Sequence, residues 1–213
     1  MLIRKEHTEG GALLGIWKMD ESRDDLMHLF PQHLRKEAMM YLRDIRSERR
    51  SIEWLSTRVM LLDLMGKEQI ILNREDGSPY LSEGKTNISI SHTRDYAAVL
   101  LHETRGVGID IETRSERVIK IAAKFISENE YIDSSQKIIH QLLHWSAKES
   151  LFKLMNEEGI DFRQHLHISP FTPAQKGTIA AHETKTERTQ LFNLQYEVHP
   201  DYVLTWTIGD ITP

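Results

Sequence analysis

The sequence predicts a mixed α/β fold that is built as two similar halves. Residues 47–65 and 134–155 have the character of two long helices, and the second carries apolar side chains at helical spacing without an internal Gly or Pro. Short runs with strand character, separated by turn residues, lie around both segments. A faint internal repeat aligns residues 53–61 with residues 144–152. These observations favour a duplicated α/β unit.

The first half is expected to begin with a strand at residues 12–19. Residues 31–44 predict a helix, because a proline is well tolerated in the first helical turn. The helix at residues 47–65 is expected to end at Gly66, which is placed as a C-cap. Four short β-rich runs then predict strands at residues 70–72, 88–91, 96–102 and 107–112.

The second half is expected to hold a basic helix around residues 116–125, followed by the helix at residues 134–155. Its late strands are predicted at residues 166–169, 178–182, 191–198 and 202–208. We place the boundary between the halves near Arg105, which gives an N-terminal half of residues 1–105 and a C-terminal half of residues 106–213.

The repeat also pairs chemically informative residues. It places Arg58 opposite Glu149, and residues 92–100 echo residues 199–207, each segment containing an Asp-Tyr pair. Related halves would form a cleft between them, which is a usual place for a ligand site.

Composition limits the function classes. With 213 residues and 39% hydrophobic content, the chain can bury a sizeable core as one large or two small domains. A net charge of -5 argues against wholesale nucleic-acid binding, and the absence of cysteine excludes disulfides and thiol catalysis. The N-terminus lacks an apolar signal core, and no run approaches the roughly 20 apolar residues of a membrane span. We therefore expect a cytoplasmic protein that is not bound to a membrane.

Acidic residues suggest a metal site. Asp110 and Glu112 lie two apart on a predicted strand, so their carboxylates point to the same side. Magnesium prefers oxygen ligands and is usually held by one or two carboxylates together with substrate phosphates. Glu149, on the second long helix, is the candidate for a third acid.

The helix around Glu149 presents further polar groups. Trp145, Glu149 and Lys153 share one face, so Lys153 can either pair with Glu149 or approach a phosphate. Lys148 lies one step round the helix. Taken alone, Glu149 and Lys153 would be an ordinary exposed ion pair, which is common on helices.

Three motifs together resemble a known family. They are Gly106-Val107-Gly108-Ile109-Asp110-Ile111-Glu112, Trp145-Ser146-Ala147-Lys148-Glu149-Ser150-Leu151-Phe152-Lys153, and Asn87-Ile88-Ser89-Ile90-Ser91-His92 preceded by Asp76-Gly77-Ser78-Pro79-Tyr80. The first two resemble the paired signature of the 4'-phosphopantetheinyl transferases, and the third resembles the upstream motif of the longer, Sfp-type branch of that superfamily. The resemblance spans roughly residues 46–155.

The resemblance implies a pseudo-twofold pair of α/β subdomains in a monomer, each a small antiparallel-rich sheet packed with a long helix. The implied reaction moves the 4'-phosphopantetheine arm of coenzyme A to a serine of an apo acyl or peptidyl carrier protein and releases 3',5'-ADP. Magnesium would be the cofactor, held by Asp110, Glu112 and Glu149.

Other roles also follow from the resemblance. Glu149 would act in catalysis, as the base or through a metal-bound water that it orients, together with Lys153. Coenzyme A would be contacted by four side chains: Arg58 at the 3'-phosphate, and Ser91, His92 and Lys148.

The turn motif departs from the family pattern. Ser78 stands where the branch often has Lys, and Thr93 stands where a second Ser often follows the histidine. Contacts to the adenine end of the substrate are therefore left open.

Two alternative functions remain at this stage. One is a catalytically silent module that binds coenzyme A or a carrier protein, and the other is a magnesium-dependent phosphohydrolase that uses the same acids.

A basic helix face predicts where the partner docks. Arg117, Lys120 and Lys124 fall on one face of a predicted helix just after the metal strand, and Arg114 leads into it. Because the chain is acidic overall, a local positive face near the site would attract an acidic carrier protein.

Overall fold

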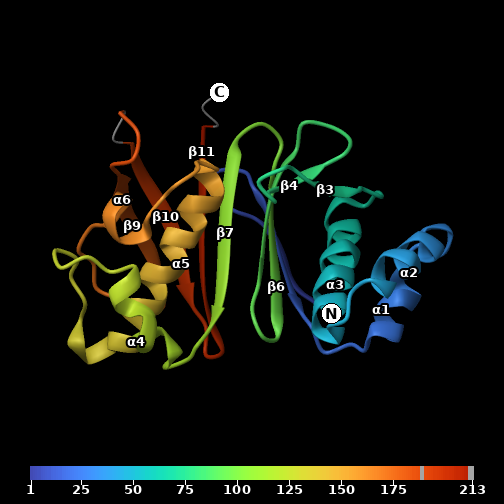
Figure 1. The fold of residues 1–213 in the computed structure, drawn as a ribbon, viewed down its shortest axis with the longest axis horizontal. Helices are drawn as coiled ribbons and strands as arrows, with labels where there is room; N and C mark the ends of the chain where they lie inside the picture. Colours follow the sequence, from blue (N-terminus) through green and yellow to red (C-terminus); the bar gives the residue numbers. More distant parts are fainter. Residues whose placement is uncertain (188–189, 211–213) are drawn as a thin grey trace.

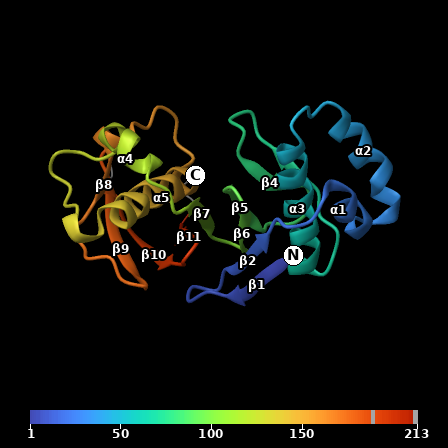
Figure 2. The ribbon, with the colours of Figure 1, turned by 90° about the horizontal axis from the view of Figure 1, so that it is seen from below.

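The computed structural model describes residues 1–187 and 190–210 and shows two antiparallel sheets, each packed with one long helix (Figure 1). Seen from below, β7 and β5 lie near the middle of the molecule; α1, α2 and α3 lie toward one end, and α4 and α5 lie beside β8 and β9 toward the other (Figure 2). The last residues of the expected C-terminal half, 211–213, lie outside the described part of the chain.

The first sheet has the strand order β1-β2-β6-β5. Its members are β1 (Leu2–His7), β2 (Leu13–Lys18), β5 (Asn87–His92) and β6 (Tyr96–His102). A separate hairpin of β3 (Ile71–Asn73) and β4 (Pro79–Leu81) stands beside it.

The second sheet has the order β7-β11-β10-β9-β8. Its members are β7 (Gly106–Thr113), β8 (Leu166–Ile168), β9 (Lys176–Glu183), β10 (Leu191–Val198) and β11 (Tyr202–Gly209).

The predicted duplication is confirmed by topology. In each half a strand precedes a long helix and four strands follow that helix. The last strand pairs with the strand that precedes the helix, giving β2-β6-β5 and β7-β11-β10. The repeated Asp-Tyr pairs begin β6 and β11, and the rings of Tyr96 and Tyr202 meet with centroids 4.8 Å apart. The turns before them are also alike, since the N–H of Thr93 donates to Tyr96 O and the N–H of His199 donates to Tyr202 O.

Helix ends follow local chemistry. Helix α3 (Glu48–Met65) begins after Ser47, whose side chain accepts from the N–H of Arg50, and ends at Gly66 with φ 64°. Helix α5 (Lys137–Met155) follows a short 3₁₀ turn at Ser134–Gln136. The remaining helices are α1 (Arg23–Leu29), α2 (Arg35–Arg43), α4 (Arg117–Ile121) and α6 (Phe162–His165), and further 3₁₀ turns lie at Gln32–Leu34 and Ala122–Lys124.

Four elements were not predicted. β1 is an edge strand that carries four consecutive charged or polar residues at its end, and α6 has only one turn. β4 lies within the motif that we treated as a turn. α1 did carry a sequence signal, since Ser22 and Asp25 form a capping box at its start.

Three apolar clusters hold these layers together. One lies between α3 and the first sheet, one lies between α5 and the second sheet, and one joins the two sheets through residues such as Leu14, Leu100, Ile109 and Leu204. Strand alternation explains this arrangement, because successive side chains enter different clusters. Within the described residues, no helix has the length and apolar character needed to cross a membrane.

Two glycines allow the long helices to approach the sheets. A Cβ at Gly108 in β7 would lie 1.9 Å from the carbonyl oxygen of Ser150 in α5. A Cβ at Gly15 in β2 would lie 2.7 Å from the side chain of Leu64 in α3. The strand that carries the acidic motif is therefore in close contact with the helix that carries Glu149.

Candidate functional site

The site begins at the seam between β5 and β7, which are edge strands of the two sheets. Hydroxyl groups of β5 and the following turn accept hydrogen bonds from the free backbone edge of β7: Ser89 Oγ from Ile109 N (3.1 Å), Ser91 Oγ from Ile111 N (3.3 Å) and Thr93 Oγ1 from Thr113 N (2.9 Å). This ladder fixes the register of β7 against the first half. It thereby fixes which residues of β5 lie beside the acidic motif of β7.

Asp110 lies at the centre of the site and is 4% exposed. Its Oδ1 accepts from Ser91 Oγ at 2.8 Å and from Lys153 Nζ at 2.9 Å. Its Oδ2 is buried and has no hydrogen-bond partner. Since buried carboxylate oxygens are normally paired, Oδ2 is available for a ligand.

Glu112 and Glu149 face Asp110 from β7 and α5. Burial raises the pKa of Glu112 to about 7, and the charges of Asp110 and Glu149 act in the same direction. Burial, followed by the charge of Asp110, raises the pKa of Glu149 to about 6. A bound cation would offset these effects and favour the ionised forms of Glu112 and Glu149.

Lys153 is the cation present at the site. Its Nζ donates to the carbonyl of Ile109 and to Asp110 Oδ1, both at 2.9 Å. The contact with Glu149 that is usual at i,i+4 spacing is not formed, because Lys153 turns toward β7. Lys153 therefore stands beside the acids with part of its side chain open to solvent.

These residues fit a hard divalent cation. Asp110 offers a free oxygen, and Glu112 and Glu149 bring the negative charge that such an ion favours. Among the described residues, no group of three His, Cys, Asp or Glu side chains is arranged to enclose a metal by itself. The expectation that all three acids share one magnesium ion remains a prediction, and substrate phosphates and waters would have to complete the shell.

Cationic side chains lie across the seam. Burial of the imidazole lowers the pKa of His92 to about 4, and the positive charges of Lys153, Arg58 and Arg49 act in the same direction. Part of the residue is nevertheless open to solvent. Its Nε2 lies 2.6 Å from Thr57 Oγ1 on α3. The charges of both Lys153 and Arg58 therefore act on His92.

Arg58 is held in an apolar pocket. Its guanidinium lies 3.8 Å from the centroid of the Trp54 ring and donates to the carbonyl of Trp54 at 3.2 Å. Burial lowers its pKa to about 10, and none of the ion pairs found among the described residues includes it. The pocket beside it has a volume of about 390 Å³ and includes Tyr41 and Gln69 in its lining. Both amide atoms of Gln69 are buried without a partner, so the pocket offers unpaired polar groups as well as a charge.

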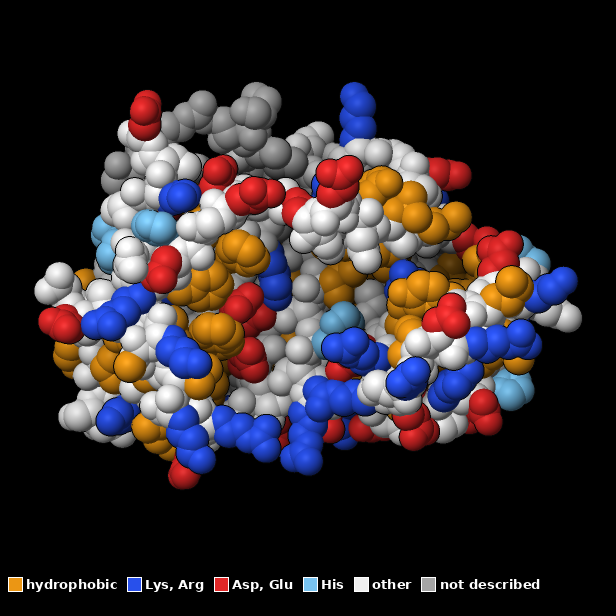
Figure 3. All heavy atoms as spheres, in the orientation of Figure 1, with side chains coloured by type: hydrophobic (Ala, Val, Ile, Leu, Met, Phe, Trp, Pro, Cys, Tyr) orange, Lys and Arg blue, Asp and Glu red, His pale blue; other side chains and the backbone are white. Residues whose placement is uncertain are grey.

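The space-filling view shows how these groups face one another (Figure 3). The front of the molecule is hollowed between the two halves, with acidic side chains on one wall and Lys, Arg and His side chains on the other. A row of basic side chains follows the lower edge of the hollow.

Comparison with known proteins agrees with this arrangement. Residues 106–207 match the family model of the 4'-phosphopantetheinyl transferase superfamily. The matched segment, which contains the acidic motif of β7 and the helix of Glu149, is similar to this superfamily. Over 104 residues the chain is 30% identical to a protein of Aneurinibacillus migulanus named 4'-phosphopantetheinyl transferase gsp. That match covers 46% of this chain and 43% of the relative, so less than half of the relative's length is represented.

Ser91 has a different role from the one expected. The superfamily resemblance suggested a contact with coenzyme A, but the Ser91 hydroxyl donates to Asp110 Oδ1 and accepts from Ile111 N. It is 5% exposed, and its single proton is already used. Ser91 therefore orients an acid of the site and has no free proton to donate to a ligand.

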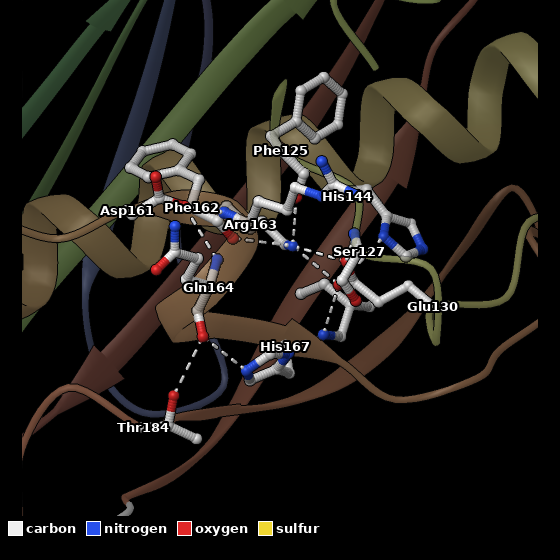
Figure 4. Close-up of polar contacts among 12 residues, drawn as sticks. Phe125, Ser127, Glu130, His144, Asp161, Phe162, Arg163, Gln164, His167 and Thr184 are labelled. Atoms are coloured by element: carbon white, nitrogen blue, oxygen red, sulfur yellow. Dashed lines mark hydrogen bonds and ion pairs between the residues drawn. The ribbon is translucent and has the colours of Figure 1, made fainter. Parts of the chain in front are cut away.

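Lys148 also lies elsewhere. It is fully buried, and its Nζ donates to Phe125 O (2.6 Å), Glu130 Oε2 (2.8 Å) and Phe162 O (3.1 Å), so a contact with coenzyme A phosphate is not available (Figure 4). The physical reason is its position: successive helical residues lie about 100° apart, so the neighbour of Glu149 points into the protein.

One residue of the site was underused in the sequence interpretation. Trp145 shares the helix face of Glu149, and its Nε1 donates to Glu112 Oε1 at 2.8 Å. The i,i+4 spacing of Trp145 and Glu149 was the available signal, but a donor reaching the strand acid could not be identified without the packing of α5 on β7.

The adenine-end turn stands beside the second half. Asp76 Oδ2 accepts from Asn156 Nδ2 at 2.8 Å, and Ser78 Oγ accepts from Arg74. Arg74 thus brings a positive charge to the turn in which Ser78 replaces the frequent lysine of the family.

Proposed function

We propose that this protein transfers the 4'-phosphopantetheine arm of coenzyme A to a serine of an apo acyl or peptidyl carrier protein. The observation that carries the proposal is the juxtaposition of Asp110, whose Oδ2 is unpaired, with Glu112, Glu149 and Lys153. This set faces a row of cations that suits a nucleotide. Similarity to the superfamily indicates the reaction type, and the residues present are those that the reaction needs.

The reaction has a defined balance. The serine oxygen forms a bond with the phosphorus that carries the pantetheine arm, and the bond from that phosphorus to the bridging oxygen breaks. The leaving group is 3',5'-ADP, and the serine proton passes to a base. Magnesium, when bound by Asp110, Glu112 and Glu149, would polarise the pyrophosphate and stabilise the leaving oxygen.

The protein's own residues supply the rest. Lys153, fixed by the carbonyl of Ile109 and by Asp110, places a positive charge where the pyrophosphate would lie. Glu149, with its pKa raised to about 6 and part of its surface open, is the proposed base for the serine proton, directly or through a water.

The nucleotide end is assigned to the first half, residues 1–105, and the metal end to the second half, residues 106–213. Arg58 would bind the 3'-phosphate, because it is buried beside Trp54 without a carboxylate partner. His92, on which the charges of Arg58 and Lys153 both act, is proposed to contact a phosphate, which would favour its protonated form.

The carrier would dock on the basic segment that follows β7. Arg114, Arg117, Lys120 and Lys124 are all exposed there, and exposed Ile119 on α4 adds an apolar contact. An acidic carrier would be steered to this face by charge.

Mass spectrometry of an apo carrier protein after incubation with coenzyme A and magnesium tests the proposal. A transferase adds the arm to the carrier, and a chelator stops the addition. Consumption of coenzyme A without modification of the carrier would instead indicate a phosphohydrolase. Binding of coenzyme A in equilibrium dialysis without either change would indicate a silent binding module. A panel of apo carriers from fatty-acid, polyketide and peptide synthesis would identify the class that is served.

A further inference from the structure

Lys148 makes an unusual set of contacts for a lysine. Its side chain is fully buried, and its three ammonium protons have three acceptors: Phe125 O, Glu130 Oε2 and Phe162 O. In Figure 4 the dashed contacts converge at one point between Phe125, Phe162 and Glu130. The ammonium therefore joins three segments: α5, the segment before Glu130, and the start of α6.

Glu130 anchors the other side of the contact. Its Oε1 accepts from the N–H of Ile168 and its Oε2 from the N–H of Ser127, each within 2.8 Å. The ring of His144 lies 3.6 Å from the same carboxylate. The carboxylate is thus fixed by backbone donors from two segments, and Lys148 is fixed by the carboxylate.

The two carbonyls that Lys148 binds belong to residues whose rings enclose Trp145. The Phe125 ring meets the indole edge-on with centroids 5.1 Å apart, and the Phe162 ring meets it at 5.6 Å. One ammonium therefore fixes the backbone beneath both rings. The orientation of the indole follows from these two contacts, because aromatic packing in a dense interior leaves few rotamers.

The indole in turn touches the proposed reaction site. Trp145 Nε1 donates to Glu112 Oε1 at 2.8 Å, which leaves Oε2 of Glu112 for other partners. Groups that hydrogen-bond a metal-binding carboxylate fix its orientation, and their loss typically lowers affinity or activity.

We propose that Lys148 is a positioning residue: it holds Phe125 and Phe162 against Trp145, and Trp145 holds the carboxylate of Glu112 in place. The inference rests on the proposed function for its kinetic consequence, but the structural step from Lys148 to the indole N–H does not. It assigns the lysine of the Trp-Ser-Ala-Lys-Glu motif to the support of an acid, where the sequence had suggested a ligand contact.

The test variant is the double change Lys148→Met with Glu130→Gln. The pair is changed together, because removing Lys148 alone would leave a buried carboxylate without its counter-ion. Lys137→Met is the matched control, since Lys137 is an exposed lysine on the same helix.

The first readout is the indole N–H region of a ¹H–¹⁵N NMR spectrum. The chain has four tryptophans, and Trp145→Phe identifies the resonance of Trp145 by its disappearance. We expect the double variant to shift or broaden this resonance while the other three stay in place, and the control to leave all four unchanged. An unmoved Trp145 resonance in the folded double variant would overturn the proposal, whether or not the protein is a transferase.

The second readout is kinetic. The double variant should have a lower kcat, and it should need about tenfold more magnesium for half-maximal activity. Loss of a group that orients a metal-binding side chain typically has an effect of this size. At saturating magnesium, the KM for coenzyme A should change by less than about twofold, because the nucleotide contacts are assigned to residues of the first half and not to Lys148 or Trp145. In a Trp145→Phe background, the same double change should lower kcat by less than about a further twofold. Residues that act through one series of contacts do not have additive effects. Full additivity would show that Lys148 acts by another route.

A further variant keeps the test decisive if the double variant does not fold. Phe162→Leu removes one wall of the indole site and leaves the Lys148–Glu130 pair intact. We expect it to move the Trp145 resonance and to lower kcat in the same way. A native Trp145 resonance in Phe162→Leu would contradict the proposal.

Discussion

Glu112→Gln should make the metal-free protein more stable at alkaline pH. Burial and the charges of Asp110 and Glu149 raise the pKa of Glu112 from 4.5 to about 7. The native state therefore binds a proton more tightly than the unfolded state does. The contribution of Glu112 to wild-type stability is therefore greatest below pH 4.5. It is lost as the pH rises through about 7, because the ionised carboxylate is disfavoured in the native state.

The magnitude follows from the shift. Each pKa unit corresponds to about 1.4 kcal/mol, so a rise in the pKa from 4.5 to about 7 means that ionised Glu112 costs the native state about 3–4 kcal/mol above pH 7. Glutamine is neutral at every pH and still offers an oxygen to Trp145 Nε1. For a chain of this length, about 3 kcal/mol corresponds to a rise in Tm of about 6–12 °C.

The assay is thermal and urea unfolding of both proteins in a metal chelator at pH 4.5 and pH 8. We expect Glu112→Gln to be the more stable protein at pH 8 and the advantage to shrink strongly at pH 4.5. In the presence of magnesium, the difference in stability between the two proteins at pH 8 should shrink or change sign, because the wild type gains stability from the bound ion. Equal pH dependence of the two proteins in chelator would refute the reasoning.

Other predictions test the remaining parts of the site. Glu149→Gln should abolish transfer while the protein stays folded, with an unfolding midpoint in chelator that is no lower than the wild-type value, because the pKa of Glu149 is also raised, to about 6. Retained activity would remove Glu149 from the base and ligand roles. Arg58→Ala should raise the KM for coenzyme A more than that for dephospho-coenzyme A, because only the former carries the 3'-phosphate; equal effects on both would exclude this contact. Replacement of Arg117 and Lys120 by Glu should raise the KM for the carrier in a salt-sensitive way. Unaltered carrier kinetics at low ionic strength would show that the carrier docks elsewhere. Gly108→Ala should destabilise the protein by about 2–3 kcal/mol in urea unfolding, since its Cβ would meet the Ser150 carbonyl, and a neutral effect would show that α5 can move away from β7.

The sequence predicted those features that depend on local periodicity. Alternation along a strand was enough to place Asp110 and Glu112 together, and four-residue spacing was enough to place Glu149 and Lys153 on one helix face. The long helices and their glycine cap followed from the same kind of pattern. The internal repeat correctly indicated two similar subdomains, because a shared order of elements gives a shared topology.

Features that depend on packing between segments could not be predicted in this way. Lys148 differs from Glu149 by one helical step, and its buried partner Glu130 lies 18 residues earlier in the chain. The hydroxyl of Ser91 was expected to contact a ligand, but the structure directs it to Asp110. This direction depends on the register between β5 and β7, which is set by side-chain contacts across the seam. No pattern within either segment reports these contacts.

The most direct test of the proposed function measures two products of one incubation. The protein, coenzyme A, magnesium and an apo carrier are mixed, and both the mass of the carrier and the amount of 3',5'-ADP are determined over time. We predict that one 3',5'-ADP is released for each carrier that gains the phosphopantetheine arm, and that Glu149→Gln forms neither product. Release of 3',5'-ADP with an unmodified carrier, or an equal rate for Glu149→Gln, would contradict the account.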